Sequence, residues 1–233
     1  MAGRTFVTGD IHGDLDALLL NLGQLPRLDA GDTLVFVGDY LNRGPKSAQV
    51  IELVRGLPQR TPAKVVLLRG NHEDGWLRAI DHGWPEFVLP AAHGCRETME
   101  SYVGPMRGEL GRKQKRALCR GTFFPCEVVD WMRSLPYYYE DPHGIYVHAG
   151  LAKHGRRWLH PSQSKLPSAL LWHRDDDFFR HYRGKRVIFG HTVTEYLPEE
   201  LSQYTPEDPK DMWAGPCTIG LDTGALGGTI RLG

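Results

Sequence analysis

The sequence lacks the features that define several protein classes. No apolar segment approaches the ~18–20 residues that a membrane span needs. Lysine plus arginine and aspartate plus glutamate balance at 28 each, so the basic excess of a nucleic-acid-binding protein is absent. The four cysteines form no C-x-x-C pair and are too few for a disulfide scaffold, so reduced thiols are expected. Because apolar residues recur along the whole chain, disorder is excluded, and a globular protein with no nucleic-acid or membrane partner remains.

The length and the first residues set the expected organisation. A chain of 233 residues can form one large domain with a substantial core. No low-complexity linker divides it, so we predict a single domain over residues 1–233. Residues 1–5 lead into an apolar segment without the pattern of a secretory signal peptide. A cytoplasmic location and a monomer are the corresponding expectations.

The apolar pattern predicts an α/β fold. Segments 5–8, 33–37 and 64–68 have the composition of buried strands, and residues 15–22 and 47–55 have that of helices. This β-α-β-α-β order is typical of a sheet with helical crossovers.

The middle and the second half of the chain do not continue the regular alternation of strands and helices. Residues 74–125 contain helical fragments and no evident strand, and we predict that they form a helical cap or insertion over the sheet. Strands are predicted again at 144–147, 186–189, 217–221 and 229–232. No long helical crossover follows residue 190, so part of this half is expected to be antiparallel.

Polar clusters follow five of the predicted strands. They are GDIHG (9–13), GDYLNRG (38–44), GNHE (70–73), HAG (148–150) and GHT (190–192). Ligands of α/β sheets collect beyond the carboxyl ends of the strands. The glycines let the backbone approach a ligand closely. The five clusters therefore predict one functional site.

The donors in these clusters are typical of a metal centre. The candidate ligands are Asp10, His12, Asp39, Asn71, His148 and His191. Oxygen and imidazole donors without thiolate suit divalent Mn, Fe, Zn or Ni. Six donors are too many for one catalytic ion with open positions, but they suit two ions that share one carboxylate, roughly 3.5–4 Å apart.

Two metal ions at such a spacing bind a phosphoryl group and make a bridging water acidic enough to attack it as hydroxide. Arg43 and Arg174 could clamp the phosphate oxygens. His72, beside the ligand Asn71, could protonate the leaving oxygen. The predicted reaction is therefore hydrolysis of a phosphoric ester.

The ordered motifs resemble the phosphoprotein-phosphatase branch of the dinuclear, calcineurin-like metallophosphoesterases, in particular the bacterial and phage serine/threonine type. The similarity runs from residue 9 to residue 224. It implies an αβ sandwich of two mixed sheets flanked by helices and two divalent ions, manganese first among them. By this resemblance Asp10, His12 and Asp39 hold the first ion, Asp39 bridges, and Asn71, His148 and His191 complete the second. Arg43, Arg174 and Asn71 would bind the phosphate.

One residue departs from the family pattern, which has Asp where this chain has Asn42. In the family that Asp pairs with the histidine that matches His72. We expect the Asn42 carbonyl to accept the Nδ1–H of His72 and to keep the ring oriented. The missing charge removes support for imidazolium, typically about 1–3 pKa units. His72 would then be a weaker general acid, which suits aryl phosphates and phosphoanhydrides better than alkyl phosphates.

Three functions stay open at this point. The first is a phosphatase acting on phosphoproteins (Ser, Thr or Tyr) or on small phosphomonoesters. The second is a symmetrical dinucleoside tetraphosphate hydrolase that uses the same site. The third is a non-catalytic relative that binds phosphorylated partners. Two further segments are interpreted as structural: the strand-end turn at 222–224 and the basic, solvated helix face at 107–120.

Overall fold

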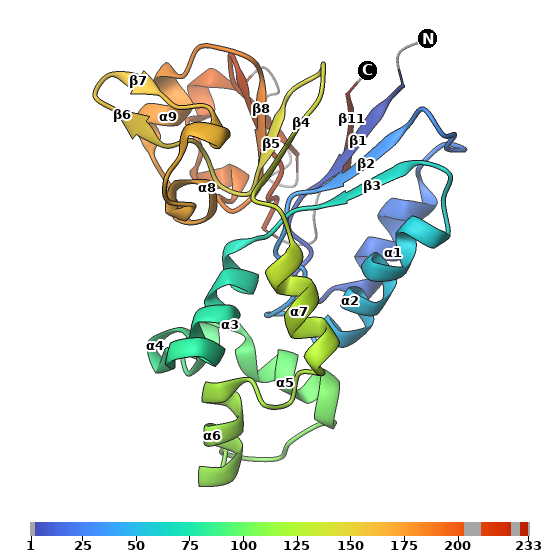
Figure 1. The fold of residues 1–233 in the computed structure, drawn as a ribbon, viewed down its shortest axis with the longest axis vertical. Helices are drawn as coiled ribbons and strands as arrows, with labels where there is room; N and C mark the ends of the chain where they lie inside the picture. The colour runs from blue at the N-terminus through green and yellow to red at the C-terminus, as the bar shows by residue number, and fades with distance from the viewer. Residues whose placement is uncertain (1–2, 203–210, 225–228, 233) are drawn as a thin grey trace.

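The computed structural model describes residues 3–202, 211–224 and 229–232, which form two mixed β-sheets between helices (Figure 1). The first sheet has the order β11-β1-β2-β3. Its parallel strands are β1 (Thr5–Thr8), β2 (Thr33–Phe36) and β3 (Lys64–Leu67), and β11 (Thr229–Leu232) pairs with β1 in antiparallel orientation. The crossovers are α1 (Leu15–Gly23) and α2 (Ser47–Gly56). This part of the prediction is confirmed.

The second sheet has the order β4-β5-β8-β10-β9. Its three inner strands, β5 (Ile145–Val147), β8 (Val187–Phe189) and β10 (Thr218–Gly220), are parallel. Its two edge strands, β4 (Tyr138–Glu140) and β9 (Trp213–Ala214), are antiparallel to their neighbours. The edges and β11 supply the expected antiparallel part. Sequence reasoning missed β4, β9 and the hairpin of β6 (Lys153–His154) and β7 (Arg157–Trp158).

Alternating side chains make the two sheets into a sandwich, because successive residues of a strand point to opposite faces. In β2, Val35 packs between the sheets while Leu34 and Phe36 face the helices. In β8, Ile188 lies in the same inner layer, and its neighbours Val187 and Phe189 face outward. The outer face of the second sheet is covered by α8 (Ser168–Trp172) and α9 (Asp176–His181). The expected sandwich of two sheets flanked by helices is confirmed.

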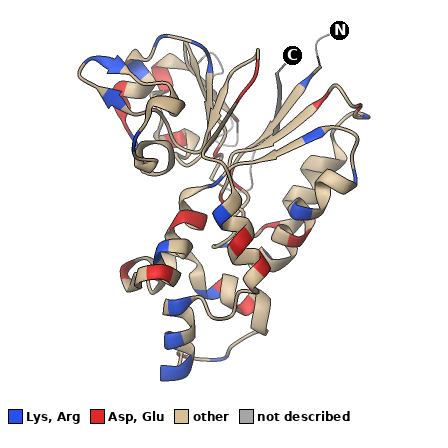
Figure 2. Ribbon diagram, in the orientation of Figure 1, with Lys and Arg blue, Asp and Glu red and all other residues tan. Residues whose placement is uncertain are grey.

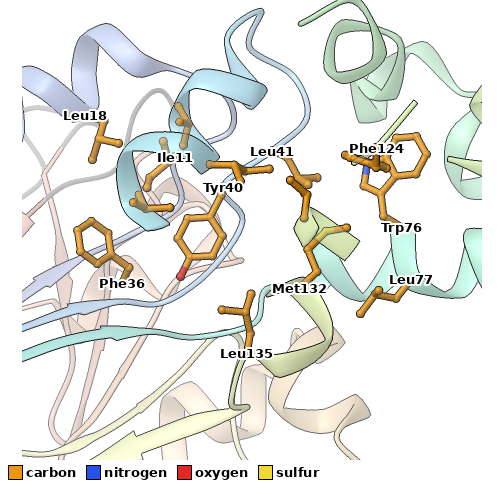
Figure 3. Close-up of a cluster of buried hydrophobic side chains, with 14 of the residues drawn as sticks. Ile11, Leu18, Phe36, Tyr40, Leu41, Trp76, Leu77, Phe124, Met132 and Leu135 are labelled. Carbon is orange, nitrogen blue, oxygen red and sulfur yellow. The ribbon is translucent and has the colours of Figure 1, made fainter. Parts of the chain in front are cut away.

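A group of helices follows β3 and lies below the sheets in Figure 1. These are α3 (Asn71–His82), α4 (Pro85–Val88), α5 (Cys95–Val103), α6 (Arg112–Arg120) and α7 (Cys126–Ser134). Trp76 of α3 is fully buried and packs against Phe87, Phe123 and Phe124, and Figure 3 shows the cluster in which it lies. This cluster packs the helices against the outer face of the first sheet and fixes the position of α3, which begins shortly after β3. Short 3₁₀ turns complete the described elements: η1 (Leu57–Gln59), η2 (Ala91–His93), η3 (Pro161–Gln163), η4 (Thr194–Tyr196) and η5 (Glu199–Leu201).

Surface features agree with the composition. All four cysteines are free thiols. The basic residues of α6, coloured blue in Figure 2, have exposed side chains, while Leu118 is buried and anchors the helix. The expected solvated helix face is therefore confirmed. Within the described part of the chain, no helix combines the length and apolarity that crossing a bilayer would need.

Candidate metal centre

The carboxyl ends of five strands bring the predicted donors to one place between the sheets. Asp10 and His12 follow β1, Asp39 follows β2, and Asn71, His148 and His191 follow β3, β5 and β8. Two glycines make the close approach possible. A side chain at Gly190 would collide with the Asp10 carboxylate, and one at Gly70 would collide with Asp39. These positions require glycine because a carboxylate occupies the space of the missing side chain.

The backbone around the site is strained. Five non-glycine residues in the described part of the chain have positive φ, and each lies in one of the predicted motifs: His12, Asp39, Asn42, Arg43 and His191. This left-handed conformation is unfavourable by about 1–2 kcal/mol per residue. Such strain collects at functional sites, where the surrounding structure holds it in place.

Glu73 holds two of these loops together. Its buried carboxylate accepts hydrogen bonds from the backbone N–H groups of Asp39, Tyr40 and Gly70, at 2.8–2.9 Å. Burial raises the pKa of Glu73 to about 6, although these donors favour its charged form. Sequence reasoning gave Glu73 no role, yet it aligns the loop after β2 with the start of α3.

His12 and the two aspartates form the first group of donors. His12 Nδ1 lies 3.1 Å from the carbonyl oxygen of Leu41, so in the neutral ring Nδ1 carries the proton and Nε2 a lone pair. Nε2 lies 3.5 Å from Asp39 Oδ2 and 3.8 Å from Asp10 Oδ2. It is buried and has no hydrogen-bond partner in the described structure. Three acceptors therefore face one another, which is the arrangement that a cation requires.

A second group of donors forms around Asn71. His148 Nδ1 lies 3.0 Å from the carbonyl oxygen of Val37, which leaves a lone pair on Nε2. That nitrogen lies 2.7 Å from Asn71 Oδ1 and 3.5 Å from Asp39 Oδ1. His191 Nδ1 lies 2.8 Å from the same Asn71 oxygen. One amide oxygen thus lies within 2.8 Å of two imidazole nitrogens, so this group also offers donor atoms for a metal ion.

The pKa shifts of the buried donors also favour a bound cation. Burial lowers the pKa of His12 and of His148 to about 3, so both rings are neutral at neutral pH. Burial, and then the charge of Asp222, raises the pKa of Asp10. Burial, and then Glu73, raises that of Asp39. Neutral imidazoles beside crowded carboxylates form a site that a divalent cation stabilises. Carboxylate and histidine donors lie within 4.8 Å of one another in two sets, His12–Asp39–His72 and Asp10–Asp39–His148, and Asp39 belongs to both.

The two predicted arginines border the centre. Arg43 is exposed and lines a cavity of about 110 Å³ together with Asp10, His12 and Asp222. Arg174 is also exposed, and its Nη2 donates to the carbonyl oxygen of His191 at 3.2 Å. Both guanidinium groups are close enough to lower the pKa of His148, after burial as the main cause. They are thus available to an anion that approaches the donors.

Residues 3–195 match the sequence pattern of the calcineurin-like phosphoesterases. The chain belongs to this family. Calcineurin-like phosphoesterases are hydrolases with a dinuclear centre of divalent metal ions, and Asp10, His12, Asp39 and His148, which belong to the two sets, are candidate ligands.

Several characterised proteins are similar to this member of the family. It is 31% identical over 230 residues to the serine/threonine-protein phosphatase PP2A-like PPG1 of Candida albicans. The aligned region covers 91% of this chain and 49% of the yeast protein. It is 31% identical over 147 residues to the symmetrical bis(5'-nucleosyl)-tetraphosphatase of Dechloromonas aromatica, covering 63% and 44% of the two chains. The chain spans about half the length of the curated relatives it matches. Among solved structures, the cold-active protein-tyrosine phosphatase of a psychrophilic Shewanella has the same fold, with a TM-score of 0.60 and 17% identity over 99% of this chain and 75% of that one.

Asn42, which departs from the family pattern, is held by several buried side chains. The Asn42 side chain is fully buried and its Oδ1 accepts hydrogen bonds from Trp76 Nε1 at 2.8 Å and from Thr98 Oγ1 at 2.7 Å. An indole N–H can only donate, so the atom that faces Trp76 must be the amide oxygen. The amide nitrogen consequently faces His72 Nδ1 at 2.7 Å and Cys95 Sγ at 3.3 Å. The expectation that the Asn42 carbonyl accepts from His72 is wrong, because Trp76 and Thr98 already occupy that oxygen.

This orientation determines the tautomer of His72. With Asn42 as the donor, Nδ1 of His72 is the acceptor and the ring proton lies on Nε2, which is 3.9 Å from Asp39 Oδ2. Burial, and next the neighbouring His12, lowers the pKa of His72 well below its ordinary value. His72 is thus a neutral ring whose Nε2–H points to the metal centre. Trp76 and Thr98, which set this arrangement, carried no recognisable signal in the sequence.

Proposed function

We propose that this chain is a two-metal phosphatase of phosphomonoesters, acting on phosphorylated proteins, with manganese as its ion. The observation that supports the proposal best is the convergence of six oxygen and nitrogen donors and two arginines at one end of the sandwich. Asp10, His12 and Asp39 would hold the first ion. Asn71, His148 and His191 would hold the second, and Asp39 would be shared, because its two oxygens face different donor groups.

The chain's own groups would divide the remaining work. Two divalent ions supply Lewis-acid activation of the attacking water and of the phosphoryl oxygens. Arg43 and Arg174 would bind the phosphate oxygens through charge-assisted hydrogen bonds, with Asn71 beside them. Backbone carbonyls of Leu41 and Val37 hold the ring protons of His12 and His148 away from the centre.

The hydrogen bond from Asn42 narrows the substrate class. His72 can offer its Nε2–H to the leaving oxygen as a hydrogen bond. A second ring proton at Nδ1 would face the Asn42 N–H at 2.7 Å, so this pair opposes the imidazolium that a strong general acid requires. A tyrosyl oxygen has a pKa near 10 and leaves more readily without full protonation than a seryl alkoxide. We therefore expect phosphotyrosyl substrates to be preferred over phosphoseryl ones.

A dinucleoside tetraphosphate is the second candidate substrate. The leaving group of a phosphoanhydride is a phosphate oxygen, which needs proton donation less than either ester. The same Asn42–His72 hydrogen bond therefore favours it, and the similarity to the Dechloromonas aromatica enzyme supports it. Against it stands the longer similarity to the PP2A-like yeast phosphatase.

We expect residues 74–125 to form a cap that selects among these substrates. The cap would be part of a single domain that comprises residues 1–233. Its contact with the site is direct: a side chain at Gly94 would collide with the backbone of Arg43. His93, next to it, lies with its ring centroid 6.4 Å from that of His72. The cap thus borders the position of the leaving group.

The deciding experiment compares kcat/KM of the manganese-loaded protein on three substrates: a phosphotyrosine peptide, the matching phosphoserine peptide and diadenosine tetraphosphate. A preference for phosphotyrosine supports the main proposal, and a preference for the tetraphosphate selects the second. Equal turnover of the two peptides would contradict the argument from Asn42. Binding of two metal equivalents without turnover of any substrate would identify a non-catalytic protein that binds phosphorylated partners.

A further inference from the structure

Asp222 is a buried carboxylate with one unsatisfied oxygen. It follows β10 at the carboxyl end of the second sheet, and only 3% of the residue is exposed. Oδ1 accepts a hydrogen bond from the backbone N–H of Gly224 at 3.0 Å, as expected of a strand-end turn. Oδ2 is buried and has no hydrogen-bond partner in the described part of the chain. Buried polar groups are almost always paired, so this oxygen needs an explanation beyond the turn.

The unsatisfied oxygen belongs to the metal centre by position. Asp222 lines the cavity of about 110 Å³ that Asp10, His12 and Arg43 also line. His12 contributes to the same cavity its own unpartnered acceptor, Nε2. After burial, the charge of Asp222 is the next cause that raises the pKa of Asp10, which shows how close the two carboxylates lie. A cation bound at this cavity would interact favourably with both unpartnered acceptors, His12 Nε2 and Asp222 Oδ2, and would offset the negative charge of the carboxylates.

Among the described residues, no basic side chain forms an ion pair with Asp222. Arg43 is exposed, and the described residues include no ion pair between it and Asp222. Glu73 shows what a satisfied buried carboxylate looks like here, because three backbone N–H groups donate to it. Asp222 has one such donor.

We propose that Asp222 is an anionic member of the metal centre that strengthens the binding of the ion held by Asp10 and His12. Two divalent ions bring four positive charges, whereas the ligand carboxylates Asp10 and Asp39 bring two negative ones, and Asp222 adds a third. Its position places this charge at the same cavity as the donors Asp10 and His12. The inference rests on the proposed two-metal centre and assigns to it a residue outside the six predicted ligands.

Isothermal titration of the metal-free protein with Mn²⁺ tests this role in Asp222→Asn. The amide keeps the size of the side chain and an oxygen for the Gly224 N–H but removes the charge. We expect two sites in the wild type and, in the variant, a dissociation constant at least about tenfold higher for one of them, as for other residues that support metal ligands. The matched control is Asp16→Asn, the same change outside the cavity, at a side chain that is 77% exposed and pairs with Lys46. This control should bind Mn²⁺ like the wild type.

Thermal unfolding gives a readout that a purely structural turn would not move. Asp222→Asn removes a charge that is unsatisfied without metal, so Tm of the metal-free protein should rise, and the further increase on adding Mn²⁺ should shrink. A residue important only for the turn would lower Tm or leave it unchanged, and unaltered Mn²⁺ affinity would overturn the inference. Asp222→Ser, which also lacks the charge, serves if the asparagine variant does not fold. A wild type that binds fewer than two ions would instead refute the proposed two-metal function.

Discussion

Asn42 donates its amide N–H to Nδ1 of His72 across 2.7 Å, while the amide oxygen is held by Trp76 and Thr98. The direction of this one hydrogen bond decides which ring nitrogen of His72 carries the proton. It converts a group that could be a general acid into a neutral hydrogen-bond donor. The proposed preference for leaving groups of low basicity follows from it.

Asn42→Asp should reverse the hydrogen bond. A carboxylate can accept from Nδ1–H of His72 while Trp76 and Thr98 continue to donate to it, so imidazolium becomes accessible and His72 can transfer a proton. Turnover of a phosphoserine peptide or an alkyl phosphate should rise by about tenfold or more, up to the roughly 10²–10⁴-fold that general acid catalysis contributes. Turnover of aryl phosphates should change much less. The measurement is kcat for matched alkyl and aryl substrates, and an equal change in both would refute this account of His72.

Asp39→Asn should remove both metal ions and with them the activity. Asp39 Oδ1 lies 3.5 Å from His148 Nε2 and Oδ2 lies 3.5 Å from His12 Nε2, so each oxygen serves a different donor group. Metal affinity should fall by more than the roughly 10–100-fold typical of residues that only support ligands. Metal content after gel filtration measures the effect. The control is Asp81→Asn: Asp81 lies on α3 and pairs with Arg133 of α7, away from the donors, so this variant should retain two ions. Substantial turnover by metal-loaded Asp39→Asn would rule out the shared position of Asp39.

The fold could be predicted from the sequence because its central strands are short apolar segments followed by glycine-containing turns. All seven predicted strands are present. The missed strands are the edges β4 and β9 and the β6–β7 hairpin, which are only two or three residues long. Segments of that length show no periodicity, so only their pairing partners reveal them.

The sequence predicts the residues of the site where a motif contains the metal-binding side chain itself. It does not predict how a side chain is oriented when distant residues hold it. The six ligand candidates meet because the parallel strands end at one edge. The orientation of Asn42 depends on Trp76 and Thr98, 34 and 56 residues further along the chain. In the sequence, Asp222 has the pattern of an ordinary strand-end turn, and its Oδ1 does accept the hydrogen bond from Gly224 N–H that such a turn requires. Only the buried, unpartnered Oδ2 indicates a further role, and the sequence does not reveal it.

Arg174→Ala should weaken substrate binding. The guanidinium lies beside the centre through its hydrogen bond to the His191 carbonyl, and no ion pair among the described residues occupies its charge. A hydrogen bond to a charged group contributes about 1.5–3 kcal/mol, so kcat/KM should fall by about 10–100-fold, mainly through KM. Competition by inorganic phosphate should weaken in parallel. Arg183→Ala, an exposed arginine that lines a different cavity, is the control, and unchanged KM and kcat in Arg174→Ala would remove this residue from the site.

The pairing of Asp32 with Arg4 should stabilise the fold in a pH-dependent way. The buried Asp32 carboxylate accepts from Arg4 Nε at 2.9 Å and from Asp29 N at 3.0 Å, and the Arg4 hydrogen bond holds the pKa of Asp32 well below its ordinary value. A pKa lowered by folding adds stability that is present above the unfolded value, near 3.9, and is lost as pH falls toward the folded value. At pH 7, Asp32→Asn should therefore lower the free energy of unfolding by about 1–3 kcal/mol.

Urea unfolding at pH 7 and near pH 3 measures both parts of this prediction. The difference between wild type and Asp32→Asn should be largest at pH 7 and shrink toward pH 3, because below a pKa near 3.9 the unfolded wild type takes up a proton at Asp32 that the folded protein does not bind. Asp16→Asn is the matched control: its side chain is 77% exposed and pairs with Lys46 at the surface, where an ion pair contributes about 0–1 kcal/mol. A difference between wild type and Asp32→Asn that stays constant with pH would show that packing, not the charge on Asp32, accounts for its contribution.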